Sequence, residues 1–142
     1  MNFTSENRVL IIDDEPDICR ILADILAPHH VLSDMVFNGF DALEKLRSES
    51  YTAVLCDINM DGMNGFECMS KAHAEGINIP FVFVTAFGDS SRMLQAVRLG
   101  AVDFIHKPFS IEEVVDVVFR VMYMGARRNE ILLAIANTSS EL

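Results

Sequence analysis

Carboxylate, hydroxyl and ammonium side chains follow four apolar segments of this 142-residue sequence, at the points where those segments end: Asp13 and Asp14, Asp57, Thr85, and Lys107. Three carboxylates brought into one crevice repel one another and call for a cation. Oxygen-only ligands suit Mg²⁺, which shares a few carboxylates with a phosphate. A carboxylate can also act as a nucleophile and become an aspartyl phosphate. The residue types therefore fit phosphoryl transfer, which needs charge neutralisation and positioning.

Each of these residues also has an ordinary structural interpretation when taken alone. Asp13 and Asp14 could cap a helix, and Asp57 could form a turn ahead of Gly62. Thr85 could be an ordinary β-branched strand residue, and Lys107 before proline could simply be solvated. Their joint placement is what these separate interpretations leave unexplained.

Short β-rich runs alternate along the chain with segments of helical periodicity. The expected strands are 8–12, 31–37, 52–56, 79–85 and 101–106, and the expected helices are 16–26, 40–46, 64–76, 89–99 and a last one that starts at the Ser110–Glu113 capping box. Such alternation predicts an α/β fold with a parallel sheet and helices on both faces. In open parallel sheets the ligand site lies beyond the carboxyl ends of the strands.

Four motifs in this order resemble the receiver domain of response regulators in two-component signalling, of the chemotaxis type. They are Val9–Asp14, Leu55–Met60, Val84–Ala86 and Gly100–Phe109. The resemblance covers roughly Asn7 to Tyr123, so we expect a receiver domain over 7–123 and a helical extension or tail over 124–142. It implies a flavodoxin-like, doubly wound five-stranded parallel sheet in the order 2-1-3-4-5.

The resemblance implies a role for each site residue. Asp57 corresponds to the phosphoacceptor, and Asp14 and Asp57 correspond to direct Mg²⁺ ligands. The backbone carbonyl of Asn59 completes the set, with Asp13 acting mostly through water. Thr85 and Lys107 match the hydroxyl and lysine that hold the phosphoryl group.

Further positions carry expectations from the same resemblance. Phe104 occupies the place of the switch aromatic; the alternative interpretation is a plain core phenylalanine on the fifth strand. The Lys107–Pro108 peptide corresponds to one that is usually cis. Asn59 and Phe87 flank the path of the hydrolytic water, so Phe87 either shields the phosphoryl group or points into solvent or a partner surface without effect. Met60-Asp61 replaces a frequent Met-Pro without threatening the chemistry.

The C-terminal part of the chain allows two interpretations. Valines and methionines wrap most of the segment from Val114 to Met124, so the surface beyond one packed stripe is either incidental or a partner surface. Beyond Gly125, the segment 126–135 predicts one further short helix. We expect either a stand-alone receiver or a piece of a longer regulator.

Composition limits the partners and the compartment. The net charge of −10 argues against direct nucleic-acid binding. Three scattered cysteines predict reduced thiols in a cytoplasmic protein, and neither a signal peptide nor a membrane span is evident. The resemblance implies a sensor histidine kinase or phosphotransfer protein as donor, a downstream protein target, and possible homodimers through the fourth helix, fifth strand and fifth helix.

Other functions remain open at this point. A Mg²⁺-dependent phosphatase with an aspartate nucleophile normally has a second acidic residue two positions later, where this chain has Asn59. A flavin-binding protein would need a Gly-, Ser- or Thr-rich loop after the first strand. A receiver-like interaction module that no longer uses phosphate would not require the intact acidic set. The favoured expectation is a phosphorylation-controlled switch and not an enzyme.

Overall fold

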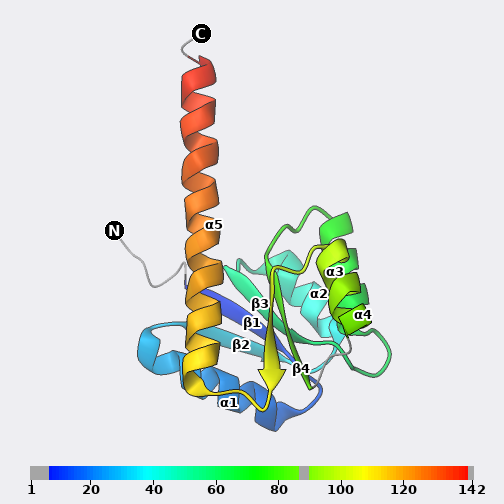
Figure 1. Cartoon of the computed structure of the whole chain (residues 1–142). Coiled ribbons are helices and arrows are strands. Elements are labelled where there is room, and N and C mark those ends of the chain that lie inside the picture. The colour runs from blue at the N-terminus through cyan, green and yellow to red at the C-terminus, as the bar shows by residue number, and fades with distance from the viewer. Residues whose placement is uncertain (1–6, 87–89, 141–142) are drawn as a thin grey trace.

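A single five-stranded parallel sheet forms the centre of the protein. The computed structural model describes residues 7–86 and 90–140. The sheet order is β2-β1-β3-β4-β5, which confirms the predicted flavodoxin-like topology (Figure 1). The strands are β1 (Arg8–Ile12), β2 (Leu32–Val36), β3 (Ala53–Asp57), β4 (Phe81–Ala86) and β5 (Asp103–Lys107).

Helices follow the strands in strict alternation. They are α1 (Pro16–Leu26) with the 3-10 turn η1 (Ala27–His29), α2 (Gly39–Ser48), α3 (Gly65–Ala74), α4 (Ser90–Leu99) and α5 (Ile111–Ser140). The predicted start of the fourth helix at Asp89, like the predicted shielding residue Phe87, lies outside the described residues.

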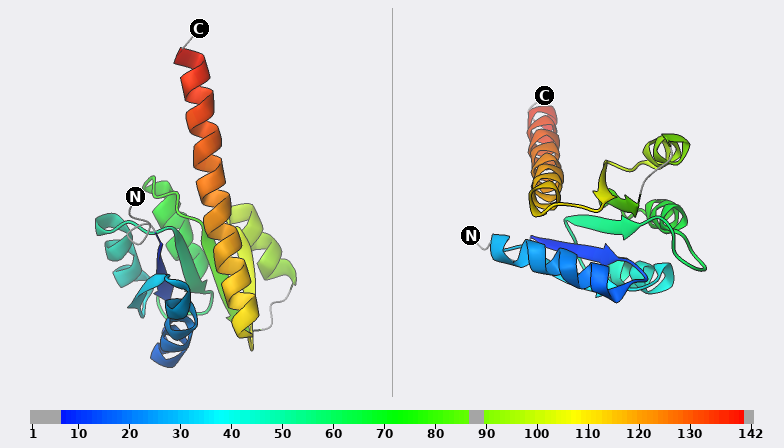
Figure 2. Two further views of the ribbon diagram at one scale, coloured as in Figure 1. Left: turned by 90° about the vertical axis from the view of Figure 1, so that its left-hand side faces the viewer. Right: turned by 60° about the horizontal axis from the view of Figure 1, so that its bottom comes forward.

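Two layers of helices enclose the sheet. The helices α1 and α5 cover one face, and α2, α3 and α4 cover the other (Figure 2). The strands β1, β3 and β4 are apolar and buried along almost their whole length, as strands covered on both faces must be. The two apolar layers fix the sheet and therefore fix where its carboxyl edge lies.

Local signals in the sequence set the helix starts. The Asn64 side chain accepts a hydrogen bond from the backbone N–H of Glu67 at 2.9 Å, and Glu67 completes the capping box. The Ser110 hydroxyl accepts from the backbone N–H of Glu113 at 3.0 Å. Pro16 occupies the first turn of α1, where its missing N–H is not needed.

The last helix differs from the expectation. The sequence predicted a separate short helix over 126–135, whereas α5 is one helix of 30 residues that continues through Gly125. An internal glycine costs only about 1 kcal/mol, and a helix already nucleated gains a hydrogen bond for each residue added. Good helix formers on both sides therefore outweigh the glycine, and α5 extends well past the sheet (Figure 1).

Valines attach the first half of α5 to the domain. Val114, Val118 and Val121 are at most 1% exposed and pack with α1 and the sheet, as one stripe was expected to do. Phe119, Tyr123 and Met124 remain partly exposed. Within 7–86 and 90–140, no helix combines the length and apolar character needed to cross a bilayer.

Candidate functional site

Parallel topology brings the chemically active residues to one edge of the sheet. Asp57 ends β3, which lies between β1 and β4, and Lys107 ends β5 opposite Ala86 of β4. Asp13 and Asp14 directly follow β1. Segments up to 94 residues apart in sequence therefore converge where the strands end.

Three carboxylates form a compact acidic cluster. One oxygen from each of Asp13, Asp14 and Asp57 lies within 4.8 Å of the other two. Asp13 and Asp57 are buried, at 2% and 8% exposure, whereas Asp14 is exposed to solvent. The cluster thus has a fixed inner part and an open outer part through which a metal or a phosphoryl donor can approach.

Lys107 reaches into this cluster from β5. Its Nζ lies 3.1 Å from Asp13 Oδ2 and 3.9 Å from Asp57 Oδ1. The other carboxylate oxygen of Asp13 accepts a hydrogen bond from the backbone N–H of Glu15 at 2.9 Å. Both oxygens of the buried Asp13 are therefore satisfied, while the Lys107 ammonium lies farther from Asp57 than from Asp13.

Burial dominates the electrostatics of Asp57. It raises the pKa of the Asp57 carboxyl to about 6, and the charge of Asp13 acts in the same direction. Lys107 and a hydrogen bond from the backbone of Asn59 oppose this rise in pKa. The carboxylate is thus ionised at neutral pH but incompletely compensated, which favours a nearby cation.

The donor set fits a hard divalent ion. Carboxylate oxygens, together with a backbone carbonyl and water, are the ligands that Mg²⁺ prefers, and the cluster presents three carboxylates with no sulfur or imidazole among them. The three carboxylates predicted to take part in metal binding, Asp13, Asp14 and Asp57, are thus close enough to share one ion.

Thr85 and Phe104 lie on neighbouring strands, Thr85 near the carboxyl end of β4 and Phe104 two residues farther back along β5. Thr85 is buried at 3% exposure, and its hydroxyl donates to the carbonyl of Ala86 at 3.3 Å. Phe104 is partly buried and packs against the core cluster beneath α2–α4, beside Phe83 on β4. The Lys107–Pro108 peptide is cis, as the resemblance implied.

Two features of the site were not foreseen from the sequence. A Cβ on Gly65 would lie 2.3 Å from the carbonyl oxygen of Asp57, so only glycine lets α3 begin so close to β3. Arg92 of α4 donates to the side-chain oxygen of Asn59 at 2.8 Å. A glycine after a helix cap hinted at the first, but nothing in the sequence pairs residues 33 apart.

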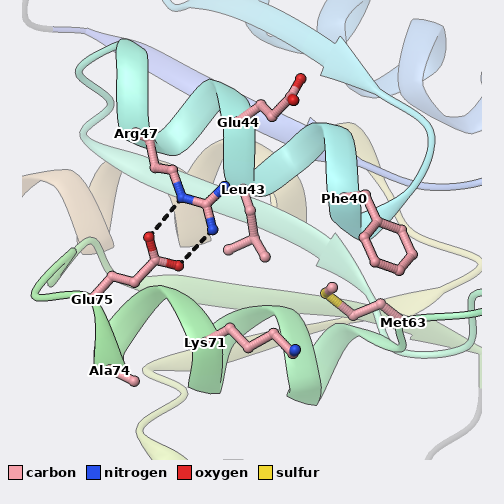
Figure 3. Close-up of a pocket in the computed structure, with 8 residues that line it drawn as sticks. All are labelled: Phe40, Leu43, Glu44, Arg47, Met63, Lys71, Ala74 and Glu75. Carbon is pink, nitrogen blue, oxygen red and sulfur yellow. Dashed lines mark hydrogen bonds and ion pairs between the residues drawn. The ribbon is translucent and has the colours of Figure 1, made fainter.

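One pocket lies away from this edge of the sheet. It has a volume of about 460 Å³ and opens between α2 and α3, where Arg47 and Glu75 form an ion pair at 2.6 Å (Figure 3). None of the acidic residues at the strand ends lines it. The candidate chemistry therefore belongs to the open edge of the sheet and not to this pocket.

The three cysteines supply no reactive thiolate, although Cys19 and Cys56 contact the backbone carbonyls of Asp13 and Asp57. Cys19, Cys56 and Cys68 are buried and unpaired, as predicted. Burial raises the pKa of Cys19 and of Cys68 to about 11, so these thiols are protonated and unreactive.

Comparison with known proteins places these residues in a family. The chain is 30% identical over 128 residues to the regulatory protein AtoC of Escherichia coli, covering 90% of this chain and 28% of AtoC. It is 31% identical over 141 residues to ResD of Bacillus subtilis, covering 99% of this chain and 57% of ResD. The chain thus spans only part of the length of these curated relatives.

Solved structures agree with the sequence relatives. NtrX of Brucella abortus superposes with a TM-score of 0.86 at 25% identity, covering 94% of this chain and 30% of NtrX. The model of the response regulator receiver domain matches residues 9–119. These matches do not favour the phosphatase, flavin-binding or phosphate-independent alternatives. The chain therefore belongs to the response regulator receiver domain family, whose members are phosphorylation-controlled signalling switches.

Proposed function

We propose that this chain accepts a phosphoryl group on Asp57 and passes the change to a protein partner. The observation that carries the proposal is the convergence of Asp13, Asp14 and Asp57 within 4.8 Å, with the Lys107 ammonium 3.9 Å from Asp57. An isolated buried carboxylate would not need both an acidic surround and a cation. A transferred phosphoryl group needs both a metal and an ammonium to balance its charge.

The proposed step is an in-line displacement at phosphorus. An oxygen of ionised Asp57 forms the new O–P bond while the bond to the donor nitrogen or oxygen breaks, and the leaving group keeps the electron pair. Asp57 is ionised for this step at neutral pH, because its pKa is about 6. Lys107 then neutralises an oxygen of the phosphoryl group.

Mg²⁺ is the proposed cofactor. Asp14, Asp57 and the backbone carbonyl of Asn59 would hold it, with Asp13 contributing through water. When bound, the ion neutralises phosphoryl oxygens and orients them for transfer. Asp13 is already occupied by Lys107 and by the backbone N–H of Glu15, which supports its indirect role.

Thr85 and Phe104 are the proposed transmitters of the signal. The Thr85 hydroxyl now donates only to a carbonyl of its own strand, a bond it can exchange for one to a phosphoryl oxygen. Thr85 lies two residues after Phe83, the strand partner of Phe104, so a movement of Thr85 would change the packing near the partly buried Phe104 ring. A ligand shifts a conformational equilibrium only through such differential contacts.

The proposed partners are a sensor histidine kinase or phosphotransfer protein as donor and a protein target downstream. A homodimer through α4, β5 and α5 is also proposed. It is supported by apolar side chains exposed on or beside these elements: Leu94, Val97, Val102 and Tyr123. In this proposal the chain has no enzymatic turnover beyond its own phosphorylation and dephosphorylation, and it does not bind nucleic acid directly.

Domain limits and compartment complete the proposal. Residues 7–123 form the receiver domain, and 124–142 form a C-terminal extension carried by α5. Three buried, unpaired cysteines support a reducing compartment, which we take to be the cytoplasm.

Intact-mass spectrometry tests the proposed acceptor. With Mg²⁺ and a small acyl-phosphate donor, the protein should gain one phosphoryl group, and the gain should disappear with EDTA or in Asp57→Asn. Undiminished labelling of Asp57→Asn would refute the assignment.

A further inference from the structure

A hydrogen bond joins helix α4 to the loop that follows Asp57. Arg92 Nη1 donates to Asn59 Oδ1 at 2.8 Å, across 33 residues of sequence. The guanidinium also lies 5.7 Å from the centre of the Phe66 ring, at the start of α3. One side chain of α4 therefore contacts both the residue two places after Asp57 and the helix that follows it.

The Phe66 ring lies against the Arg92 guanidinium and restricts its orientation. Phe66 is 6% exposed, and its ring meets Phe83 edge-on at 5.1 Å between centroids and 88° between planes. Phe83 is fully buried in β4 and pairs with Cys56, next to Asp57. Because a guanidinium is planar and is attracted to an aromatic face, the contact with Phe66 favours the orientation in which Arg92 donates to Asn59.

The bond to Arg92 engages the part of Asn59 that a hydrolytic water would use. A water that attacks phosphorus must aim a lone pair at it, so its hydrogens must go to acceptors. The amide oxygen of Asn59 is such an acceptor, whereas its NH₂ group can only donate. While Arg92 donates to that oxygen, the amide is turned toward α4.

We propose that Arg92 is a positioning residue that holds the Asn59 side chain toward α4 and so lengthens the life of phosphorylated Asp57. This inference rests on the proposed function of Asp57 and adds a means of regulation to it. It links the position of α4 to the rate of phosphoryl loss. A partner that draws α4 away from α3 would break the bond between Arg92 and Asn59 and so shorten its own signal.

Measuring the loss of the phosphoryl group tests this role. Wild type and Arg92→Ala are labelled with Mg²⁺ and an acyl phosphate, the donor is removed, and the surviving phosphoprotein is followed by intact mass. Arg92→Ala should lose the group about three- to tenfold faster, the range expected for one hydrogen bond. Arg98→Ala, which removes the same charge from the last turn of α4, should match wild type.

A double-mutant cycle separates positioning from simple charge. In an Asn59→Ala background, Arg92→Ala should no longer accelerate the loss, because the side chain that it holds is absent. Acceleration of equal size in that background would overturn the proposal in favour of a direct charge effect. An equal lifetime for wild type and Arg92→Ala would overturn it as well.

NMR spectroscopy tests the contact between Arg92 and Asn59 without phosphorylation. The side-chain amide resonances of Asn59 should shift in Arg92→Ala and stay in place in Arg98→Ala. If wild type gains no phosphoryl group, the proposed function fails, while this measurement still judges the contact. Unmoved Asn59 resonances in Arg92→Ala would refute it.

Discussion

Helices α3 and α4 have the same length and cover the same face of the sheet, yet they are held very differently. In α3, Gly65, Phe66, Cys68, Met69 and Ala72 are buried. Among the described side chains of α4, only Ala96 is buried, while Leu94 and Val97 are 50% and 53% exposed. The helix after Asp57 is thus anchored, and the helix after Thr85 is the one that can move.

Truncating an apolar side chain in each helix gives the strongest contrast. Met69 is fully buried, so Met69→Ala should lower the free energy of unfolding by about 2–5 kcal/mol. Leu94→Ala should change it by no more than about 0.5 kcal/mol. Urea denaturation measures both. Losses of similar size would show that α4 is anchored as firmly as α3.

Asp57, which precedes the anchored helix α3, is a carboxylate whose charged form is destabilised by burial. Its pKa is about 6 in the folded protein against an ordinary 3.8. The folded state therefore binds more protons between about pH 4 and pH 6, and stability falls as the pH rises through that window. Without divalent cations, Asp57→Asn should be about 2–3 kcal/mol more stable than wild type at pH 8, and this gain should fade toward pH 4.

Unfolding curves at several pH values, with EDTA present, measure that gain. Asp61→Asn, which removes an exposed charge from the same loop, is the matched control. A constant difference between Asp57→Asn and wild type from pH 4 to pH 8 would contradict the assigned cause.

Gly65 tests how tightly α3 is seated on β3. In Gly65→Ala the new Cβ would lie 2.3 Å from the Asp57 carbonyl oxygen, which is backbone and cannot turn aside. We expect a loss of about 1–3 kcal/mol and slower phosphorylation, because Asp57 itself is displaced. Gly39→Ala, at the start of α2, meets the flexible Met63 side chain at 2.8 Å and should cost less. Equal costs would argue against a rigid contact.

Thr85 precedes the movable helix α4, and its substitution should affect the response to phosphorylation more than stability. Thr85→Ala should lower the free energy of unfolding by about 1 kcal/mol and still accept a phosphoryl group. The shift of α4 backbone resonances on phosphorylation should be largely lost, and Thr85→Ser should restore it. A response in Thr85→Ala equal to that of wild type would exclude this route.

The features that depend on local sequence patterns were predictable from the sequence. Apolar runs located the strands, and the boxes at Asn64 and Ser110 located two helix starts, because these signals depend on neighbours within a few residues. The rule for parallel sheets then brought Asp13, Asp57 and Lys107 together. Each of these steps needed only periodicity and topology.

The parts that depend on three-dimensional packing were not predictable. Asp13 and Asp14 are adjacent in sequence, yet one is buried against Lys107 and the other is exposed. The approach of Gly65 to β3 and the contact between Arg92 and Asn59 join segments that only the folded chain brings together. Gly125 predicted a break in α5 because local propensity takes no account of cooperativity along an existing helix.

The length of α5 turns a small motion into a large one. At 1.5 Å per residue, the 17 residues from Met124 to Ser140 form a lever of about 25 Å beyond the packed valines. If α5 stays straight, a tilt of about 10° at its base, where it packs against α1, β3 and β5, would move the far end by about 4 Å. Whatever binds that end would sense the state of the sheet from a distance, without touching the site itself.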